Sequence, residues 1–212
     1  MKKIASILLS LVLLMSYVTS ASAEEGAGSQ QEVYNLLEEY GFEVIQGNTK
    51  IPITTSVTDI EELEDVLKEF KENIEIEKQT SKEILIPASS ESTMKATYND
   101  SHQNTWWCPG NAGWGGTAVT ITCNVSYDYS YTFNSNDDPY FTSLSNIKSQ
   151  LDGIHLYTWV QNNASYNFTK TNYNNDTAKI KVLGYYLLGI EWNGVPIGAT
   201  MSDEWNCSLR LY

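Results

Sequence analysis

Residues 117–133 show the most regular alternation of apolar and polar side chains in the chain. Apolar or aromatic residues occupy the odd positions from Val119 to Phe133, and Thr, Asn, Ser or Asp fills the even positions between them. A period of two over this length predicts a β-strand with one buried and one hydrated face. A strand of this length would span on the order of 50 Å, so we expect a bend, a bulge or a switch between two sheets along it.

The rest of the C-terminal half repeats this alternation. Ile180 to Trp192 keeps its apolar residues on even positions, and Asn193-Gly194 then predicts a type I′ hairpin turn. Further strands are predicted over 155–169, with a break at Asn162-Asn163, and over 205–211.

One segment of this half has a different spacing, which predicts a short helix; its apolar residues are Phe141, Leu144, Ile147 and Leu151. Several antiparallel strands joined by polar turns predict a β-sandwich or an open barrel over residues 106–212.

The N-terminal half is dominated by helical spacing. Ser29 and Glu32 form a capping-box pair before a short amphipathic stretch that ends at Gly41. Thr58 and Glu61 repeat the pair before a longer apolar stripe, made of Ile60, Leu63, Leu67, Phe70 and Ile74. The sequence therefore predicts two helices in this half.

Short strands are predicted around these helices, over 42–45 and 51–57, and a small hairpin is predicted over 74–86. Residues 24–87 are thus expected to form a small acidic α/β module. Residues 88–105 are rich in Ser, Thr and Asn and are predicted to be a linker. The whole chain is expected to have an α+β fold.

Residues 1–23 have the pattern of a bacterial-type signal peptide. Lys2 and Lys3 precede an apolar core, and Ala21-Ser22-Ala23 fits a cleavage site. The apolar core is shorter than the ~20 residues that span a bilayer, so we expect a secreted, extracellular protein with no membrane insertion after signal cleavage.

The charge is strongly negative and unevenly distributed. The formal net charge is −13, and residues 24–100 hold 18 acidic and 6 basic side chains, a net of −12. Because no basic stripe is present to displace phosphate counterions, we exclude nucleic acid as a partner.

Three cysteines in an exported chain predict one disulfide. Cys108 and Cys123 flank a glycine-rich segment that bends easily, and we favour this pair, which would contribute roughly 3 kcal/mol. Pairing of Cys123 with Cys207 is the alternative, because both lie in the apolar phase of predicted strands.

Catalytic chemistry has little support in the sequence. His102 and His155 are the only histidines, and neither belongs to a nucleophile, zinc or phosphate-loop motif. No cofactor or metal is therefore expected. A carboxylate pair remains open, which gives a secreted carbohydrate-active hydrolase as one alternative, with Asp128, Glu191 or Asp203 as its acids. Oxygen-rich residues 134–138 suit calcium by ligand type, although a polar turn explains them more simply.

Aromatic residues give the strongest functional hint. The chain has 14 tyrosines and six tryptophans, and Trp106, Trp107 and Trp114 cluster around the glycine-rich segment. Exposed rings bind sugars or other proteins. We therefore predict a non-catalytic binding module for a glycan or protein surface, with these tryptophans as its ligand-binding residues. A toxin or bacteriocin-like effector, with an acidic pro-segment cleaved in the linker, is the second alternative.

Overall fold

The computed structural model describes residues 30–45, 51–79, 82–88, 96–108, 121–153 and 157–212, so the expected signal peptide lies outside the described residues. Two helices, residues 30–39 and α2 (Ile60–Gln79), occupy the N-terminal part. The strands are β1 (Glu43–Val44), β2 (Thr55–Val57), β3 (Glu83–Ile86), β4 (Tyr98–Cys108), β5 (Ile121–Phe133), β6 (Pro139–Asp152), β7 (Tyr157–Thr169), β8 (Thr177–Trp192) and β9 (Val195–Leu211).

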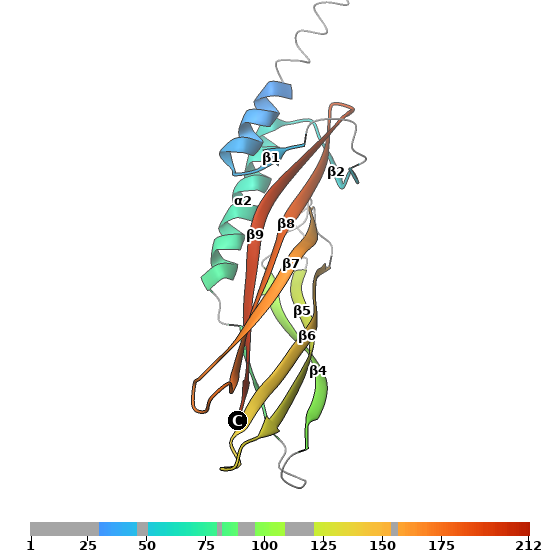
Figure 1. Cartoon of the computed structure of the whole chain (residues 1–212). Helices are drawn as coiled ribbons and strands as arrows, with labels where there is room; N and C mark the ends of the chain where they lie inside the picture. The colour runs from blue at the N-terminus through green and yellow to red at the C-terminus, as the bar shows by residue number, and fades with distance from the viewer. Residues whose placement is uncertain (1–29, 46–50, 80–81, 89–95, 109–120, 154–156) are drawn as a thin grey trace, which may run out of the picture.

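The strands form two sheets (Figure 1). In the large sheet, β8 and β9 pair along their whole length, β7 and β2 lie along the free edge of β8, and β1 and β3 lie along β9. The small sheet has the order β4-β5-β6. All pairs are antiparallel except β2 with β8 and β3 with β9. The predicted α+β fold with a mainly antiparallel β-sandwich is confirmed.

One face of the large sheet is covered by two different layers. Near the helices, the Phe70 ring of α2 lies 4.3 Å from Tyr157 and 5.2 Å from Tyr186. Further along the same face, Trp205 of β9 meets Trp106 of β4, with ring centroids 5.6 Å apart. The helical layer and the small sheet therefore share the inner face of one long sheet.

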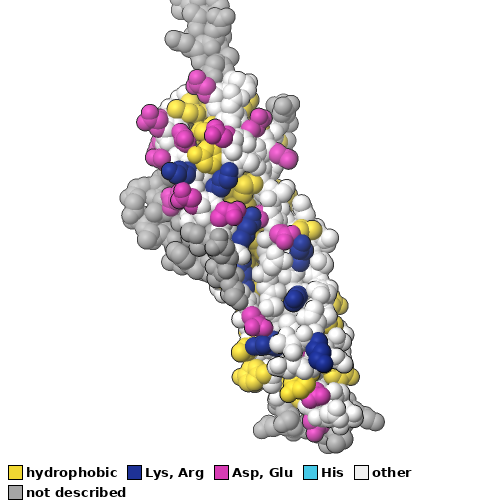
Figure 2. Space-filling model, turned by 90° about the vertical axis from the view of Figure 1, so that its left-hand side faces the viewer, with side chains coloured by type: hydrophobic (Ala, Val, Ile, Leu, Met, Phe, Trp, Pro, Cys, Tyr) yellow, Lys and Arg dark blue, Asp and Glu magenta, His cyan; other side chains and the backbone are white. Residues whose placement is uncertain are grey.

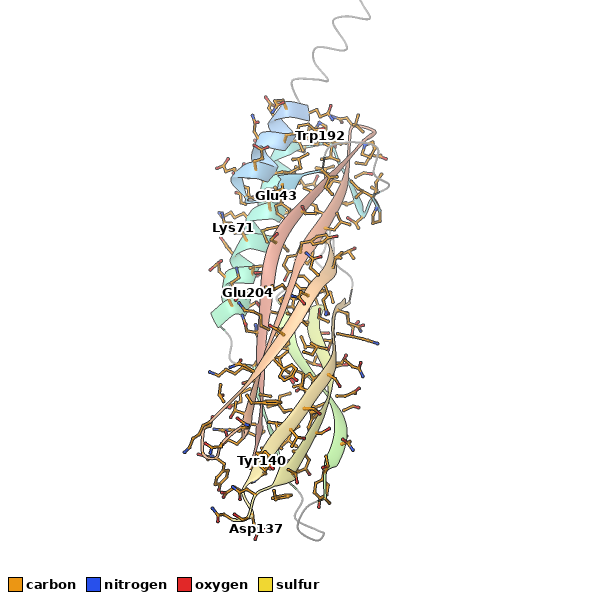
Figure 3. All side chains as sticks on the ribbon, viewed as in Figure 1. Glu43, Lys71, Asp137, Tyr140, Trp192 and Glu204 are labelled. Carbon is orange, nitrogen blue, oxygen red and sulfur yellow. The ribbon has the colours of Figure 1, made fainter. Side chains whose placement is uncertain are left out.

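Acidic side chains gather at the helical end of the molecule. The surface of α2 carries Glu61, Glu62, Glu64, Asp65, Glu69 and Glu72, and Figure 2 shows acidic side chains collected over this end. Trp192, at the end of β8, also lies at this end, whereas Asp137 and Tyr140 lie at the opposite one (Figure 3). Neither described helix combines the length and apolar character that crossing a membrane would require.

Aromatic stacking holds the middle of the sandwich together. The rings of Trp159 and Trp205 stack with centroids 4.1 Å apart at 9°. The Trp205 indole N–H also donates to the Tyr186 hydroxyl at 3.0 Å. Trp205 is fully buried and Trp192 is 5% exposed, so both belong to the core.

Several local predictions are confirmed with small changes. Asn193 and Gly194 both have positive φ, 47° and 82°, as a type I′ turn requires. The predicted break at Asn162-Asn163 is a bulge within a continuous β7. The cap of α2 is one residue later than predicted, because the Asp59 carboxylate accepts the Glu61 N–H.

The predicted helix over Phe141–Leu151 is wrong, because these residues belong to β6. The register of β6 against β5 shifts twice, between the partners of Ser130 and Tyr131 and between the partners of Ser126 and Asp128. At each bulge β6 has one residue more than β5, so the next inward side chain of β6 comes three residues later instead of two. A strand with two bulges therefore places apolar residues at intervals of three and imitates a helix.

The predicted linker over 88–105 and hairpin over 74–86 also differ from the structure. Tyr98 to Cys108 forms β4 in unbroken register with β5, so the second half of the predicted linker is a strand of the small sheet. Its residues are mostly polar on both faces, including the buried Asn104, so the apolar alternation is weak. Ile74 lies in α2, while Ile84 lies in β3 beside β9, so the hairpin does not form.

The predicted disulfide between Cys108 and Cys123 is wrong, as is the alternative with Cys207. Cys123 and Cys207 are buried, and neither is in a disulfide in the described part of the chain. In the β4–β5 register Cys123 lies opposite Trp106, while Cys108 lies opposite Ile121. Such diagonal neighbours have Cα atoms about 7–8 Å apart, beyond the ~6.8 Å that a disulfide normally bridges.

Candidate functional site

The outer face of the small sheet carries almost only polar side chains, and we call it the polar face. Apart from the two bulges of β6, it consists of alternate residues of the three strands: Asn99, Ser101, Gln103 and Thr105 of β4, Thr122, Asn124, Ser126, Asp128, Ser130 and Thr132 of β5, and Tyr140, Ser143, Ser145, Asn146, Lys148, Gln150 and Asp152 of β6. Only Asp128, Lys148 and Asp152 among them are charged. This face is therefore nearly uncharged within a strongly acidic chain.

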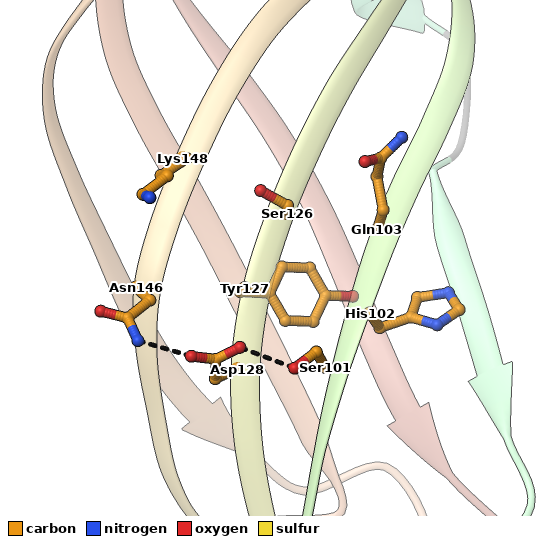
Figure 4. Close-up of a pocket in the computed structure, with 8 residues that line it drawn as sticks. All are labelled: Ser101, His102, Gln103, Ser126, Tyr127, Asp128, Asn146 and Lys148. Carbon is orange, nitrogen blue, oxygen red and sulfur yellow. Dashed lines mark hydrogen bonds between the residues drawn. The ribbon is translucent and has the colours of Figure 1, made fainter.

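An open hollow of about 680 Å³ lies in the middle of the polar face, and we call it the face hollow; it is lined by Ser101, His102, Gln103, Ser126, Tyr127, Asp128, Asn146 and Lys148. Figure 4 shows Ser101 and Asn146 on the flanking strands, bonded to Asp128 between them. The volume is within the range of small-molecule sites.

Asp128 is the charged acceptor at the centre of the face hollow. Its two carboxylate oxygens accept from the Ser101 hydroxyl at 2.8 Å and from the Asn146 amide at 2.5 Å. The Asn146 and Ser101 hydrogen bonds hold the pKa of Asp128 below its usual value, and Lys148 lowers that pKa further. Asp128 therefore presents a fixed carboxylate to any ligand in the hollow.

A β-bulge brings Asn146 to this position. Asn146 has φ of 53°, a left-handed conformation that Asn tolerates better than most residues. The register shift in β6 falls at the same place, between the partners of Ser126 and Asp128. The extra residue lets both Asn146 and Lys148 reach the hollow from one strand.

Hydrogen bonds across the strands fix the side chains beside the hollow. Asn124 accepts from Gln103 at 2.8 Å and from Thr105 at 2.6 Å, and its amide donates to Asp152 at 2.8 Å. Ser130 donates to Asn99 at 2.6 Å. These cross-strand bonds prearrange donors and acceptors on the polar face, which lowers the entropy cost of binding a polar ligand.

Ser101, His102 and Asp128 line the same hollow but do not form a catalytic triad. Ser101 donates directly to Asp128, where a triad would place the histidine between them. Successive residues of a strand point to opposite faces, and the His102 ring lies toward Tyr127, 6.4 Å between centroids. His155 lies outside the described residues.

Trp106, a predicted ligand-binding residue, is buried and only 8% exposed. Its indole N–H donates to Glu77 at 2.7 Å, and the Lys82 ammonium lies 4.7 Å from its ring centroid. Lys82 and Glu77 form an ion pair whose side chains are 5% and 1% exposed. Trp106 therefore joins α2 to the small sheet. The Trp107 side chain and Trp114 lie outside the described residues.

The carboxylates considered for hydrolysis lie on three different surfaces. Asp128 belongs to the outer face of the small sheet, while Glu191 accepts from Ser56 at the edge of the large sheet. Asp203 faces α2 and pairs with Lys78 at 3.2 Å. A glycosidase needs two carboxyl groups flanking one bond, and these three do not meet.

The oxygen-rich segment 134–138 is a polar turn. Asn134 Oδ1 accepts the N–H groups of Asn136 at 2.7 Å and Asp138 at 3.0 Å, and the Asn134 amide donates to Asp138. These oxygens are used within the turn. Across the ranges that the structure describes, no group of three or more His, Cys, Asp or Glu residues is arranged to hold a metal ion.

The buried Cys207 lies in an unreactive environment. Burial raises its pKa to about 12, although Lys82 acts in the opposite direction. Thiolate is the reactive form of cysteine, so this thiol stays protonated at neutral pH.

Sequence reasoning found Asp128 but missed most of its neighbours. The linker prediction hid Ser101 and Gln103, and the helix prediction hid Asn146 and Lys148. The signal in β4 was weak, because Tyr98 and Trp106 are the only aromatic residues of this strand's even positions besides His102. No family model, curated protein or solved structure matches the chain.

Proposed function

We propose that this protein is a non-catalytic binding module and that the polar face of the small sheet binds a glycan. The observation that carries the proposal is the face hollow, in which Asp128, Ser101, Asn146 and Gln103 present fixed hydrogen-bonding groups. Sugar hydroxyls both donate and accept, so they match a surface that mixes carboxylate, amide and hydroxyl groups.

The composition of the polar face favours a glycan over a protein partner. Protein interfaces are centred on several aromatic, Met and Arg side chains in dry pockets, whereas Tyr140 is the one such side chain among the described residues of the polar face. Short Ser, Thr and Asn side chains lose little conformational entropy when a ligand orders them. The strongly negative net charge, −13, favours an uncharged glycan over an acidic one.

The proposal includes export of the chain from the cell and retention of its N-terminal part. The leader pattern in residues 1–23 supports export. Retention is supported by packing, because Phe70 of α2 is buried and its ring packs on Tyr186 at the inner face of the large sheet. Removal of a pro-segment would uncover this face, so the toxin alternative gains no support. Mass spectrometry of the culture medium should find a chain that starts near Glu24.

A glycan array with matched variants tests the proposal. Binding should occur with the intact protein, fall at least about tenfold in Asp128→Ala, and persist in Glu191→Ala. Glu191 is a suitable control because it is also a strand carboxylate that accepts from a neighbouring serine, but it lies on the large sheet. Absence of glycan binding, or equal loss in both variants, would contradict the proposal.

A further inference from the structure

A second hollow of about 590 Å³ adjoins the face hollow, at the seam between the two sheets. We call it the seam hollow; β6 lines one side with Ser145 and Asn146, and β7 lines the other with Gln161, Asn163 and Tyr166. Asn146 lines both hollows. They therefore meet at the β6 bulge, where the outer face of the small sheet turns toward the large sheet.

Contacts between β6 and β7 lie on either side of the seam hollow along the strands. At one end the Trp159 indole N–H donates to Ser149, and Ser149 donates to Gln161, both at 2.8 Å. At the other end Phe141 and Phe168 stack across the seam, with centroids 5.7 Å apart. The two sheets are in contact above and below the hollow, so its shape is held by the sandwich itself.

Tyr166 provides an exposed aromatic ring in the seam hollow, and the residues that line the face hollow include no exposed aromatic ring. Its side chain is 41% exposed, and its ring lies 5.1 Å from that of Phe168, which supports it from one side. A tyrosine ring offers a flat apolar surface with a polar hydroxyl, which suits the apolar face and hydroxyl groups of a sugar. The other lining groups named above are amides and hydroxyls.

We propose that the two hollows are consecutive subsites for one linear, uncharged oligosaccharide, which runs across the β6 bulge and stacks one sugar on Tyr166. This inference rests on the proposed glycan-binding function. Each hollow alone falls within the ~300–1,000 Å³ typical of small-molecule sites, so the pair accommodates more than a single sugar. The bulges at Asn146 in β6 and in β7 also disfavour pairing of a peptide strand with either of these strands. This favours a polymer other than a peptide as the ligand of the two hollows.

Titration calorimetry with a neutral monosaccharide and with its successively longer linear oligomers tests the inference. Affinity should rise at least about tenfold from the monosaccharide to the longer oligomers. Tyr166→Ala should remove most of this gain and leave monosaccharide binding unchanged. Tyr173→Ala is the matched control, because Tyr173 is similarly exposed, at 38%, but lines neither hollow.

Asn146→Gly provides a second variant that keeps the fold. Glycine accepts the positive φ of this position, while loss of the amide removes a group from both hollows. Binding of every oligomer should therefore weaken. Circular dichroism and urea unfolding would show that the variants remain folded.

The failures of the two proposals are distinguishable. Binding that depends on Asp128 but does not strengthen with oligosaccharide length, or that is unaffected by Tyr166→Ala, would overturn the proposal of two consecutive subsites. The proposed glycan site in the face hollow would remain. Failure of every oligomer and the monosaccharide to bind would overturn both proposals.

Discussion

The inner and outer faces of the small sheet are formed by alternate residues of the same strands, yet their chemistry differs. On β5 the inner face carries Val125, Tyr127 and Tyr129, each at most 3% exposed. The outer face carries Ser126 and Asp128 between them, and both line the face hollow. Residues that are adjacent in the sequence thus belong to the protein core and to the candidate binding surface.

This difference separates stability from recognition along one strand. Buried rings contribute through the apolar area that they remove from water, and each aromatic side chain buries about 150–250 Å². Exposed polar side chains exchange hydrogen bonds to water for hydrogen bonds to one another, with a small net gain. Substitution of a buried residue should therefore lower stability, whereas substitution of the exposed residue next to it should weaken ligand binding.

Substitution of Tyr127 should have the largest effect on stability. Tyr127 is 2% exposed, and its hydroxyl donates to the buried Asn104. Tyr127→Ala should lower the free energy of unfolding by about 4 kcal/mol, as measured by urea denaturation. Ser126→Ala, one residue away, should change it by less than about 0.5 kcal/mol but weaken glycan binding. Similar destabilisation by both variants would show that the two faces are not separable.

The buried ion pair between Lys82 and Glu77 places two charged groups on the inner side. Lys82→Met should cost about 3 kcal/mol, because it leaves the Glu77 carboxylate buried without its counterion. Adding Glu77→Gln should recover much of this loss, since Gln is neutral and still accepts from Trp106. Thermal and urea unfolding of both variants provide the measurement. A double variant as unstable as the single one would indicate that buried charge is not the cause.

Asp176 extends the comparison to a buried carboxylate. It has no exposed surface and accepts the N–H groups of Thr171, Asn172 and Tyr173, which fixes the β7–β8 turn. Asp176→Asn should cost about 2 kcal/mol in urea unfolding. Asp137→Asn, in an exposed turn, is the control and should be nearly neutral.

The pH dependence of stability should show the same contribution from Asp176. Burial raises the pKa of Asp176, but hydrogen bonds from the backbone of Tyr173, Asn172 and Thr171 outweigh it, so the pKa lies below the usual 3.8. Ionisation of this group therefore stabilises the folded protein above that pH, and the contribution is lost as pH falls further. The difference in stability between the native protein and Asp176→Asn should shrink on acidification. A constant difference would contradict this account.

Glycan binding should change little in mild acid. Hydrogen bonds from Asn146 and Ser101 hold the pKa of Asp128 below 3.8, so its carboxylate persists into the pH range where an ordinary Asp is protonated. Calorimetric affinity should change little until the pH falls below that range. Ser101→Ala removes one of the stabilising donors, and loss of binding in this variant should begin at higher pH. An identical profile would argue against Asp128 as the acceptor.

The long alternating strands could be predicted from the sequence because each has an uninterrupted buried face. The patterns of β5 and β8 were both recognised in this way, and so was the turn at Asn193-Gly194. Two bulges made β6 resemble a helix, which concealed Asn146 and Lys148. The position of β4 depends on its pairing with β5, and a polar edge strand carries little local signal.

The candidate site was predictable only in part, for a related reason. Asp128 was recognisable because it is a carboxylate on the polar face of a strongly alternating strand. Trp106 appeared to be a surface residue because its partners, Glu77 and Lys82, lie far from it in the sequence. Contacts of this kind are set by the way the sheets and α2 meet, which local spacing does not encode.

The β8–β9 ribbon pairs continuously from Thr177 with Arg210 to Trp192 with Val195, beneath both the helices and the small sheet. Disruption of either layer therefore exposes part of the same ladder and weakens the support of the other. We expect the two ends of the molecule to melt together in a single cooperative transition, although their sequences differ in composition and charge.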